Sequence, residues 1–259
     1  MVQIDLSGRK ALVTGGARGI GAGVVSVLAK CGADVVFTHL DIPDDWKAAE
    51  VLKVNLRDSG VKVVNYVARA QEMEEMQKVV DSAADELNGL DIVIPNVGVN
   101  WVIPLADLEI DKWKKGIELN LTTSFIAAKA AYPHLRKAKR GDMVFIGSSA
   151  VYDGGGGSVF YAAAKAGVEG MAFGLMREMP QENIHVNVVH PCVVDTDLLR
   201  SRYNTEEKID KLKATVPIGR LSKPEDVGNM VAFLCSELGS FICGQSILID
   251  GGRTMWKRS

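Results

Sequence analysis

Short apolar runs alternate with longer amphipathic stretches along most of this chain. A run at 11–14 is closed by two glycines, and the apolar positions that follow recur at helical spacing up to Gly32. The same alternation predicts strands at 11–14, 34–40, 61–67, 90–94, 143–146, 184–189 and 246–249. Further helices are predicted at 46–56, from 73 to near 89, from 110 to 133 or slightly beyond, at 159–179, and from 224 to 234. Short connections between these elements indicate an α/β fold, a doubly wound parallel sheet of about seven strands with helices on both faces.

One segment departs from this alternation. Residues 195–215 are charged and only weakly patterned, although Thr205, Glu206 and Glu207 are suited to begin a helix. We interpret 193–215 as an excursion over the functional site. The sequence has no repeat and no linker, and its 259 residues fit one α/β domain, so we expect a single domain over 1–259.

Composition narrows the class of protein. The chain has 30 basic and 32 acidic residues, a net charge of −2, so no overall basic surface predicts nucleic-acid binding. It has no secretory leader and no apolar run long enough to span a membrane, which predicts a cytoplasmic protein. The four cysteines show neither the spacing of a zinc site nor that of a Cys-x-x-Cys pair: Cys31, Cys192, Cys235 and Cys243. We therefore expect no metal site, and we expect free thiols in a reducing compartment.

Tyr161 and Lys165 are the first candidates for chemistry. They stand four residues apart in an alanine-rich helical run, so their side chains share one face. A cation near a phenol lowers its pKa from about 10 and helps it to exchange protons at neutral pH. Ser148, thirteen residues before Tyr161 at a strand end, could reach the same pocket, and Ser149 is its rival. A tyrosine and a lysine four residues apart more often lie on an ordinary helix surface than in a functional site.

A glycine-rich turn joins the first strand to the first helix. Gly15, Gly19 and Gly21 leave room for an anion such as a pyrophosphate to approach backbone N–H groups and a helix N-terminus. The alternative is a tight turn with close helix packing. In dinucleotide-binding folds an acidic residue some 20 positions later often holds the adenosine ribose. Here the second strand ends in His39, with Asp41 slightly late.

Taken together, the motifs resemble those of the short-chain dehydrogenase/reductase family. The resemblance covers nearly the whole chain and implies a Rossmann-type fold and a nicotinamide-dependent oxidoreductase, similar to 3-oxoacyl reductases and sugar or polyol dehydrogenases. The matching positions, in order, are 14–21, Asn96, Gly98, Asn120, Ser148, Tyr161, Lys165, Asn187, Pro191, Thr196, 217–220, 224–226 and 250–252.

By this resemblance the catalytic residues are Asn120, Ser148, Tyr161 and Lys165. Tyr161 would protonate the substrate carbonyl oxygen during hydride transfer, and Ser148, whose offset from Tyr161 matches the family better than that of Ser149, would hold that oxygen. Lys165 would lower the Tyr161 pKa and bind the nicotinamide ribose, and Asn120 would support a proton-relaying water. The implied cofactor-binding residues are Gly15, Arg18, Gly19, Ile20, Gly21, His39, Asn96, Gly98, Tyr161, Lys165, Pro191 and Thr196.

The chain departs from the family pattern at several positions. Pro95 replaces an asparagine after the fourth strand, and Cys192 replaces the glycine after Pro191. His39 stands where NAD-preferring members usually carry aspartate. Without that carboxylate, Arg18 could pair with a 2′-phosphate, so we expect NADP, with NAD as the alternative if Asp41 reaches the ribose.

The expected substrate pocket mixes aromatic and polar residues, since Asn100, Trp101, 149–160 and 193–215 should line it. This composition favours a small or medium polar ketone or alcohol, such as a sugar or polyol. A 3-oxoacyl thioester is the alternative substrate, and a nucleotide-binding regulator without catalysis is the non-enzyme alternative. The resemblance also implies a homotetramer. A basic cluster could attract an acidic carrier protein, although such clusters are more often solvated faces: Arg136, Lys137, Lys139 and Arg140.

Overall fold

A seven-stranded sheet forms the centre of the computed structural model, which describes residues 3–155 and 157–255. Every neighbouring pair is parallel, and the strand order is β3-β2-β1-β4-β5-β6-β7. The predicted Rossmann-type sheet is therefore confirmed, and its strand order reverses between β1 and β4. The strands are β1 (Lys10–Val13), β2 (Asp34–His39), β3 (Val63–Val67), β4 (Ile92–Ile94), β5 (Gly141–Ile146), β6 (Ile184–Pro191) and β7 (Ser246–Ile249).

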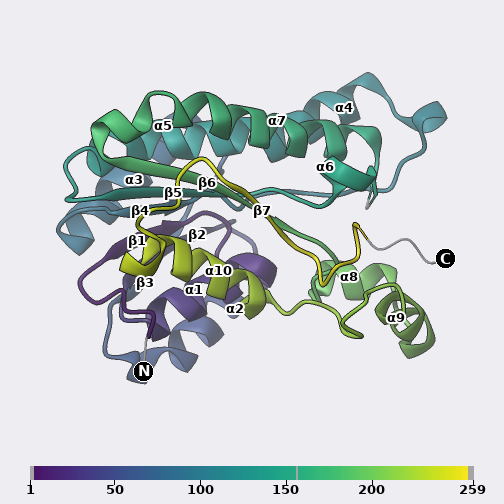
Figure 1. Cartoon of the computed structure of the whole chain (residues 1–259), viewed down its shortest axis with the longest axis horizontal. Helices are drawn as coiled ribbons and strands as arrows, with labels where there is room; N and C mark the ends of the chain where they lie inside the picture. The colour runs from purple at the N-terminus through teal and green to yellow at the C-terminus, as the bar shows by residue number, and fades with distance from the viewer. Residues whose placement is uncertain (1–2, 156, 256–259) are drawn as a thin grey trace.

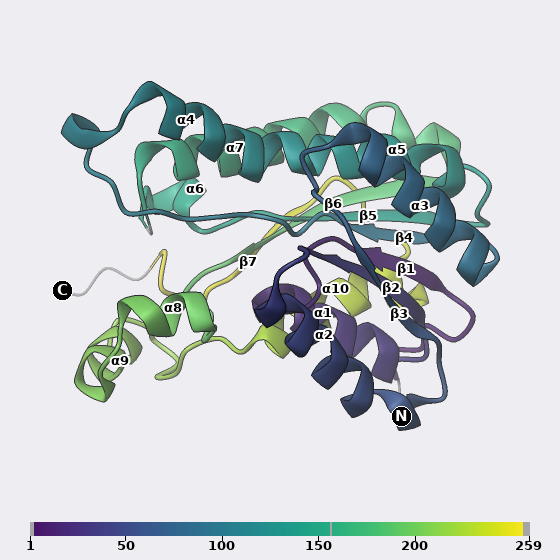
Figure 2. The ribbon, with the colours of Figure 1, turned by 180° about the vertical axis from the view of Figure 1, so that it is seen from behind.

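Helices cover both faces of the sheet (Figures 1 and 2). One face carries α1 (Gly19–Lys30), α2 (Pro43–Asn55) and α10 (Pro224–Cys235). The other carries α3 (Met73–Leu87), α5 (Thr123–Leu135) and α7 (Val159–Met176), with α4 (Ile110–Ile117) packed beside α7. No helix among the described residues is long and apolar enough to cross a membrane.

Alternate residues of the central strands pack into separate cores. Ala11 and Val13 of β1 contact the α1 and α10 layer, whereas Leu12 contacts the α3 and α5 layer, and all three are fully buried. This burial on both faces explains why the strands read as continuous apolar runs in the sequence.

Three short helices lie away from the sheet. They are α6 (Ala150–Asp153), α8 (Asp197–Arg202) and α9 (Glu206–Lys213), and they gather beyond the carboxyl ends of β5 and β6 (Figure 1). The predicted helix start in the excursion is confirmed, because the Thr205 hydroxyl accepts a hydrogen bond from Lys208 N at 3.3 Å. The excursion therefore contains ordered helices at the edge where ligands bind in such sheets.

Two element boundaries differ from those predicted from the sequence, and each involves a proline. Helix α2 begins at Pro43, three residues before the predicted start, because the first helical position needs no N–H donor. Strand β6 runs through Pro191, which pairs in register with Ile249, although we expected the strand to stop there. Pro191 still offers its carbonyl, which accepts a hydrogen bond from Ser149 N at 3.0 Å.

A buried network of charged side chains lies at the amino ends of the strands, opposite the edge where ligands are expected. The Asp142 carboxylate, 1% exposed, contacts the guanidinium groups of Arg9 at 2.6 Å and Arg140 at 3.0 Å. Burial raises the pKa of Asp142, and the two arginines oppose that shift. Both arginines also donate to backbone carbonyls near the end of α10, so the network joins β1, β5 and α10.

Removing this carboxylate should destabilise the fold. Asp142→Ala leaves two largely buried guanidinium groups without their anion, which costs about 3–5 kcal/mol in comparable networks. We expect the melting temperature to fall by about 10 °C in thermal denaturation followed by circular dichroism. Glu207→Ala, which breaks the exposed pair with Lys211, is the control and should shift it by about 1 °C or less. Equal shifts in the two variants would contradict a structural role for Asp142.

Candidate active site

The glycine-rich turn forms an open cradle at the start of α1. Gly15 N donates to Thr38 Oγ1 at 3.1 Å and Gly16 N to Thr38 O at 2.9 Å, which ties the turn to the end of β2. A Cβ atom at Gly21 would lie 2.2 Å from Gly15 O, so only glycine allows this approach. The N-cap residue is Arg18, whose guanidinium has no acceptor with which to cap the first N–H groups of α1. Amide groups there can therefore bind an anion such as a pyrophosphate.

Asn96 and Gly98 connect β4 to this cradle in different ways. The Asn96 side-chain amide donates to Thr14 O at 3.0 Å and to Gly15 O at 3.1 Å. Asn96 therefore fixes the shape of the turn. A Cβ atom at Gly98 would lie 2.8 Å from Asn120 Oδ1 and 3.4 Å from Lys165 Nζ. The glycine leaves room for these two side chains to approach the loop after β4.

Asn120 lies in a π-helical turn between α4 and α5, at Glu118–Thr122, where the sequence predicted one continuous helix. Its side chain is fully buried. Asn120 Nδ2 donates to Gly116 O at 2.8 Å, and Oδ1 accepts from Val99 N at 3.1 Å. The π-turn frees backbone groups from the usual helical pattern, as such turns often do at functional sites. The side chain thereby fixes the loop after β4 against the helix.

Tyr161, Lys165 and Ser148 meet at the carboxyl end of β5. The Lys165 ammonium lies 5.9 Å from the centre of the Tyr161 ring and donates to Ile146 O at 2.9 Å. Lys165 is only 3% exposed, and burial lowers its pKa to about 8. Contrary to the expected lowering, the pKa of Tyr161 is raised, because burial outweighs the Ser148 side-chain hydrogen bond and the charge of Arg202, which both lower it. The predicted phenol, cation and hydroxyl are therefore neighbours.

The Ser148 hydroxyl hydrogen-bonds with the Tyr161 phenol. Ser148 Oγ accepts a hydrogen bond from Ala150 N at 3.2 Å, which leaves its proton available for another oxygen. This geometry favours Ser148 as the hydroxyl that interacts with a substrate oxygen.

The end of β2 is where adenosine selectivity is expected. His39 is 3% exposed, and its ring nitrogens already have protein partners, Leu40 O at 2.8 Å and Asn65 Nδ2 at 2.9 Å. The Arg18 guanidinium, 46% exposed, instead pairs with Asp45 at 2.6 Å, beside Leu40. Of these residues, Arg18 therefore presents the accessible cation at this position.

The Asp41 side chain contacts a tryptophan and not the glycine cradle. Its carboxylate accepts a hydrogen bond from Trp46 Nε1 at 2.8 Å, and the Trp46 ring packs edge-on against His39. Asp45 is the carboxylate near Arg18. These contacts restrain the acidic groups that could otherwise repel a 2′-phosphate.

The loop after β4 and the segment before α7 form one wall. Ser158 Oγ accepts from Ile103 N at 2.7 Å and donates to a carbonyl of the same loop, with Trp101 O and Ile103 O each at 2.8 Å. Trp101 and Phe160 pack with ring centres 5.5 Å apart. A Cβ atom at Gly157 would lie 1.9 Å from Asn100 Oδ1, so the two segments meet closely. Residue 156 of the glycine run lies outside the described residues.

Arg202 brings a second cation to the Tyr161 side of this wall. It lies at the end of α8 in the excursion and donates to the Asn100 carbonyl. Its charge lowers the pKa of Tyr161. Sequence reasoning included this residue in the covering segment but did not identify it as a functional group.

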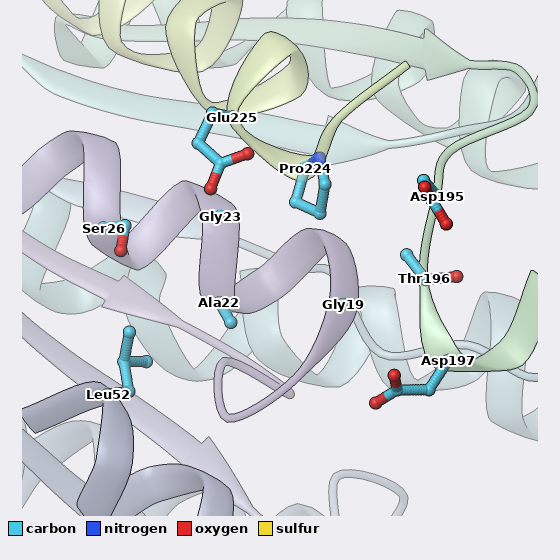
Figure 3. A pocket seen from close by; sticks show the side chains of 10 residues that line it. All are labelled: Gly19, Ala22, Gly23, Ser26, Leu52, Asp195, Thr196, Asp197, Pro224 and Glu225. Atoms are coloured by element: carbon cyan, nitrogen blue, oxygen red, sulfur yellow. The ribbon is translucent and has the colours of Figure 1, made fainter. Parts of the chain in front are cut away.

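A pocket of about 320 Å³ lies beside the cradle, between the starts of α1, α8 and α10 (Figure 3). Gly19 and Thr196 form part of its wall, and the Thr196 methyl lies 3.5 Å from the place a Cβ atom would occupy at Gly19. Three carboxylates also line it, Asp195, Asp197 and Glu225, and the Asp195 carboxylate pairs with Arg200 at 2.6 Å. Neither Tyr161 nor Ser148 lines it, so it is separate from the catalytic residues.

Comparisons with known proteins agree with this geometry. Residues 15–254 match the sequence profile of a family described as Enoyl-(Acyl carrier protein) reductase. The 3-oxoacyl-(acyl-carrier-protein) reductase FabG of Vibrio cholerae is 33% identical over 252 residues, which is 97% of this chain and 100% of that protein. A tropinone reductase homolog of Arabidopsis thaliana is 33% identical over 258 residues, 97% of this chain and 94% of that protein. The chain belongs to the short-chain dehydrogenase/reductase family.

A solved structure of the family supports the same assignment. A short-chain dehydrogenase from Burkholderia cenocepacia J2315 in complex with NADP is 32% identical and superposes with a TM-score of 0.86 over 96% of this chain and 98% of that one. This family member is therefore an NAD(P)-dependent oxidoreductase that acts on CH–OH groups. The cradle at Gly15 and Gly21 fits the pyrophosphate of such a cofactor.

The pKa shifts predict the pH dependence of this dehydrogenase. If Tyr161 is the base, alcohol oxidation should rise with pH as the Tyr161–Lys165 pair loses a proton, because only the ionised phenol can accept the proton of the alcohol. Lys165 has a pKa of about 8, and we expect an apparent pKa of about 8 or higher in kcat/KM. Because the Ser148 hydroxyl lowers the pKa of Tyr161, Ser148→Ala should raise this apparent value. A profile unchanged in Ser148→Ala, or shifted to lower pH, would contradict the arrangement.

Proposed function

We propose that this protein interconverts a secondary alcohol and its ketone, with Tyr161 as the acid and base. The observation that carries the proposal is the meeting of Tyr161, Lys165 and Ser148 at the carboxyl edge of the sheet, beside the glycine cradle. A nicotinamide held beside the glycine cradle would supply or accept the hydride at the substrate carbon. The residues of the chain orient the substrate oxygen and move its proton.

In the reductive direction, Tyr161 donates its phenolic proton to the carbonyl oxygen as negative charge develops there. The Ser148 hydroxyl donates a hydrogen bond to the same oxygen and stabilises that charge. The buried Lys165 ammonium favours the phenolate that remains. In the oxidative direction each proton moves the opposite way.

Asn120 and Lys165 provide the return path for the proton. Both side chains lie close to Gly98, in the loop after β4. Asn120 Nδ2 is bound to Gly116 O, which fixes the amide in one orientation. We propose that a water held by Asn120 relays protons between Lys165 and solvent, and that Tyr161 is thereby reset after each turnover.

We also propose NADP as the preferred cofactor. Arg18 is an exposed cation at the start of α1, where it pairs with Asp45, and a related dehydrogenase was solved with NADP. A 2′-phosphate would replace Asp45 as a partner of the guanidinium or share it. His39, whose ring nitrogens bind other residues, acts here through packing against Trp46.

Arg18→Met tests the cofactor proposal. Loss of a charge-assisted contact worth about 1.5–3 kcal/mol should reduce kcat/KM for NADPH by about 10- to 100-fold. The value for NADH should change by less than about 3-fold, because that cofactor has no 2′-phosphate to lose. Equal losses with the two cofactors, or a wild-type preference for NADH, would contradict the proposal.

The wall contacts favour a small polar substrate. Trp101 packs on the fully buried Phe160, and Ser158 hydrogen-bonds with the opposite loop, so these contacts join the two segments of the wall. We therefore retain sugars, polyols and similar hydroxy compounds as the proposed substrates. The reductases among the relatives support 3-oxoacyl thioesters as the second candidate. The predicted carrier-binding patch is weaker than expected, since Arg140 belongs to the buried Asp142 network and Arg136 pairs with Glu182.

A substrate panel distinguishes these candidates. We expect turnover, followed by absorbance of the reduced cofactor, with sugars, polyols or small secondary alcohols, and with their ketones in reverse. Activity confined to 3-oxoacyl thioesters would favour the second candidate. Cofactor binding without turnover of any compound in the panel would favour a nucleotide-binding regulator and contradict the proposed function.

Exposed apolar side chains support the homotetramer as a further part of the proposal. Phe125 of α5 is 52% exposed, and Val159 and Phe173 of α7 are 48% and 41% exposed. These helices are the ones through which the family resemblance implies subunit contacts. Mass measurement in solution should give about four times the 27.9 kDa of one chain. A monomeric mass across the working concentration range would contradict it.

A further inference from the structure

A buried histidine lies directly beneath Ser148. His190 is the penultimate residue of β6, and its side chain is 0% exposed. Its ring packs on the backbone of Gly147, where a Cβ atom would lie 2.4 Å from His190 Nδ1. The same nitrogen is 3.0 Å from both the amide nitrogen and the carbonyl oxygen of Ser148. The imidazole therefore contacts the main chain of the residue that presents the proposed catalytic hydroxyl.

The other ring nitrogen of His190 faces a carboxylate. His190 Nε2 lies 3.5 Å from Glu169 Oε1, on the helix that carries Tyr161 and Lys165. Glu169 Oε1 also accepts a hydrogen bond from Tyr152 OH at 2.9 Å and interacts with the Ser246 hydroxyl. Tyr152 and Ser246 contact each other at 2.8 Å. The carboxylate is thus held in place from α6 and β7 while it faces the imidazole.

This arrangement determines which nitrogen carries the proton. Burial lowers the pKa of His190, so the ring is neutral at pH 7 and has one N–H. A proton on Nδ1 would be donated to Ser148 O, but it would leave the lone pair of Nε2 facing the Glu169 carboxylate. A proton on Nε2 instead faces the carboxylate favourably and lets Nδ1 accept from Ser148 N. Glu169 therefore favours the second tautomer, and His190 then restrains the Ser148 amide.

We propose that Glu169 and His190 are a positioning pair for Ser148, an inference that rests on the proposed function. Neither residue is part of the proposed set that contacts substrate or cofactor. His190 fixes the Ser148 amide, Ala150 N fixes the Ser148 oxygen, and the hydroxyl proton is left to point toward the Tyr161 phenol and the substrate oxygen. Catalytic groups need such support, because displacements of about 1 Å can cost about 100-fold in rate.

The competing explanation is that His190 only fills the core above Gly147. A packing role would lower stability in any variant and would act independently of the Ser148 hydroxyl. A positioning role acts through Ser148, so its effect on turnover should disappear when that hydroxyl is absent. The two explanations can therefore be separated by a double-mutant cycle.

Glu169→Gln keeps the size of the side chain and removes its charge. With a ketone found active in the panel, we expect kcat to fall about 10-fold, with KM and the Kd of NADPH changed less than 2-fold. In the Ser148→Ala background the same substitution should change the residual kcat less than 2-fold. Glu182→Gln, an exposed carboxylate paired with Arg136, is the charge control and should leave kcat unchanged. Equal losses from Glu169→Gln in both backgrounds would overturn the proposal.

A pair of substitutions tests His190 itself. His190→Asn keeps a hydrogen-bonding atom near the position of Nδ1, and His190→Leu has similar bulk and no acceptor. We expect the Asn variant to retain kcat within about 3-fold and the Leu variant to lose at least about 10-fold, at comparable melting temperatures. Equal kcat in the two variants would overturn the proposal. If the Leu variant does not fold, the Glu169→Gln cycle still decides.

The tautomer can be measured without turnover. Long-range ¹H–¹⁵N spectra of ¹⁵N-histidine protein at pH 7, compared with His190→Asn for assignment, should show His190 protonated at Nε2 and bare at Nδ1. In Glu169→Gln we expect loss or mixing of this preference. An Nδ1-protonated ring in the wild type would overturn the inference even if the enzyme is active. The expected tautomer in a protein that turns over no substrate would instead separate failure of the proposed function from failure of this inference.

Discussion

Burial of the Lys165 ammonium is the constraint on which the active site depends. A cation that is 3% exposed must have polar partners, and Lys165 donates to the carbonyl of Ile146 at the end of β5. That contact joins α7 to the end of β5. Tyr161 lies one turn earlier on the same helix and is thereby positioned near the strand end. The same burial lowers the Lys165 pKa to about 8, so the group can exchange a proton near neutral pH. One desolvated side chain thus links the packing of the helix to its chemistry.

Parallel pairing supplies the rest of the site. Because all seven strands point the same way, the loops after β1, β4, β5 and β6 meet at one edge. The glycine cradle follows β1, the Asn96 and Gly98 loop follows β4, Ser148 follows β5, and Cys192 follows β6. The opposite edge carries the Asp142 network, which contributes to stability and lies away from the proposed chemistry. Function and structural support are therefore separated along the strand direction.

The sequence predicted the fold well because its signals are local and repeated. All seven strands and the main helices follow from hydrophobic period and from glycine or proline boundaries. The exceptions are also local: a helix started by Pro43, a strand continued through Pro191, and a π-turn around Asn120. A π-turn leaves the stripe of apolar residues almost unchanged, so spacing alone does not reveal it.

The candidate site was less accessible to sequence reasoning where it depends on tertiary contacts. The four-residue spacing predicted that Tyr161 and Lys165 are neighbours. The resemblance of the flanking motifs added Ser148 and Asn120 to the predicted site. Arg202 and the pairing of His190 with Glu169 depend on how the excursion and the sheet register place distant residues. The opposite holds for His39: its position in the sequence suggested a cofactor-binding role, but in the structure its ring nitrogens bind protein atoms.

The most direct test of the central claim is single-turnover hydride transfer in Tyr161→Phe, with NADPH binding checked by fluorescence titration. At saturating NADPH we predict a transfer rate about 100- to 10,000-fold below wild type; a rate within 10-fold of wild type would contradict the role proposed for Tyr161.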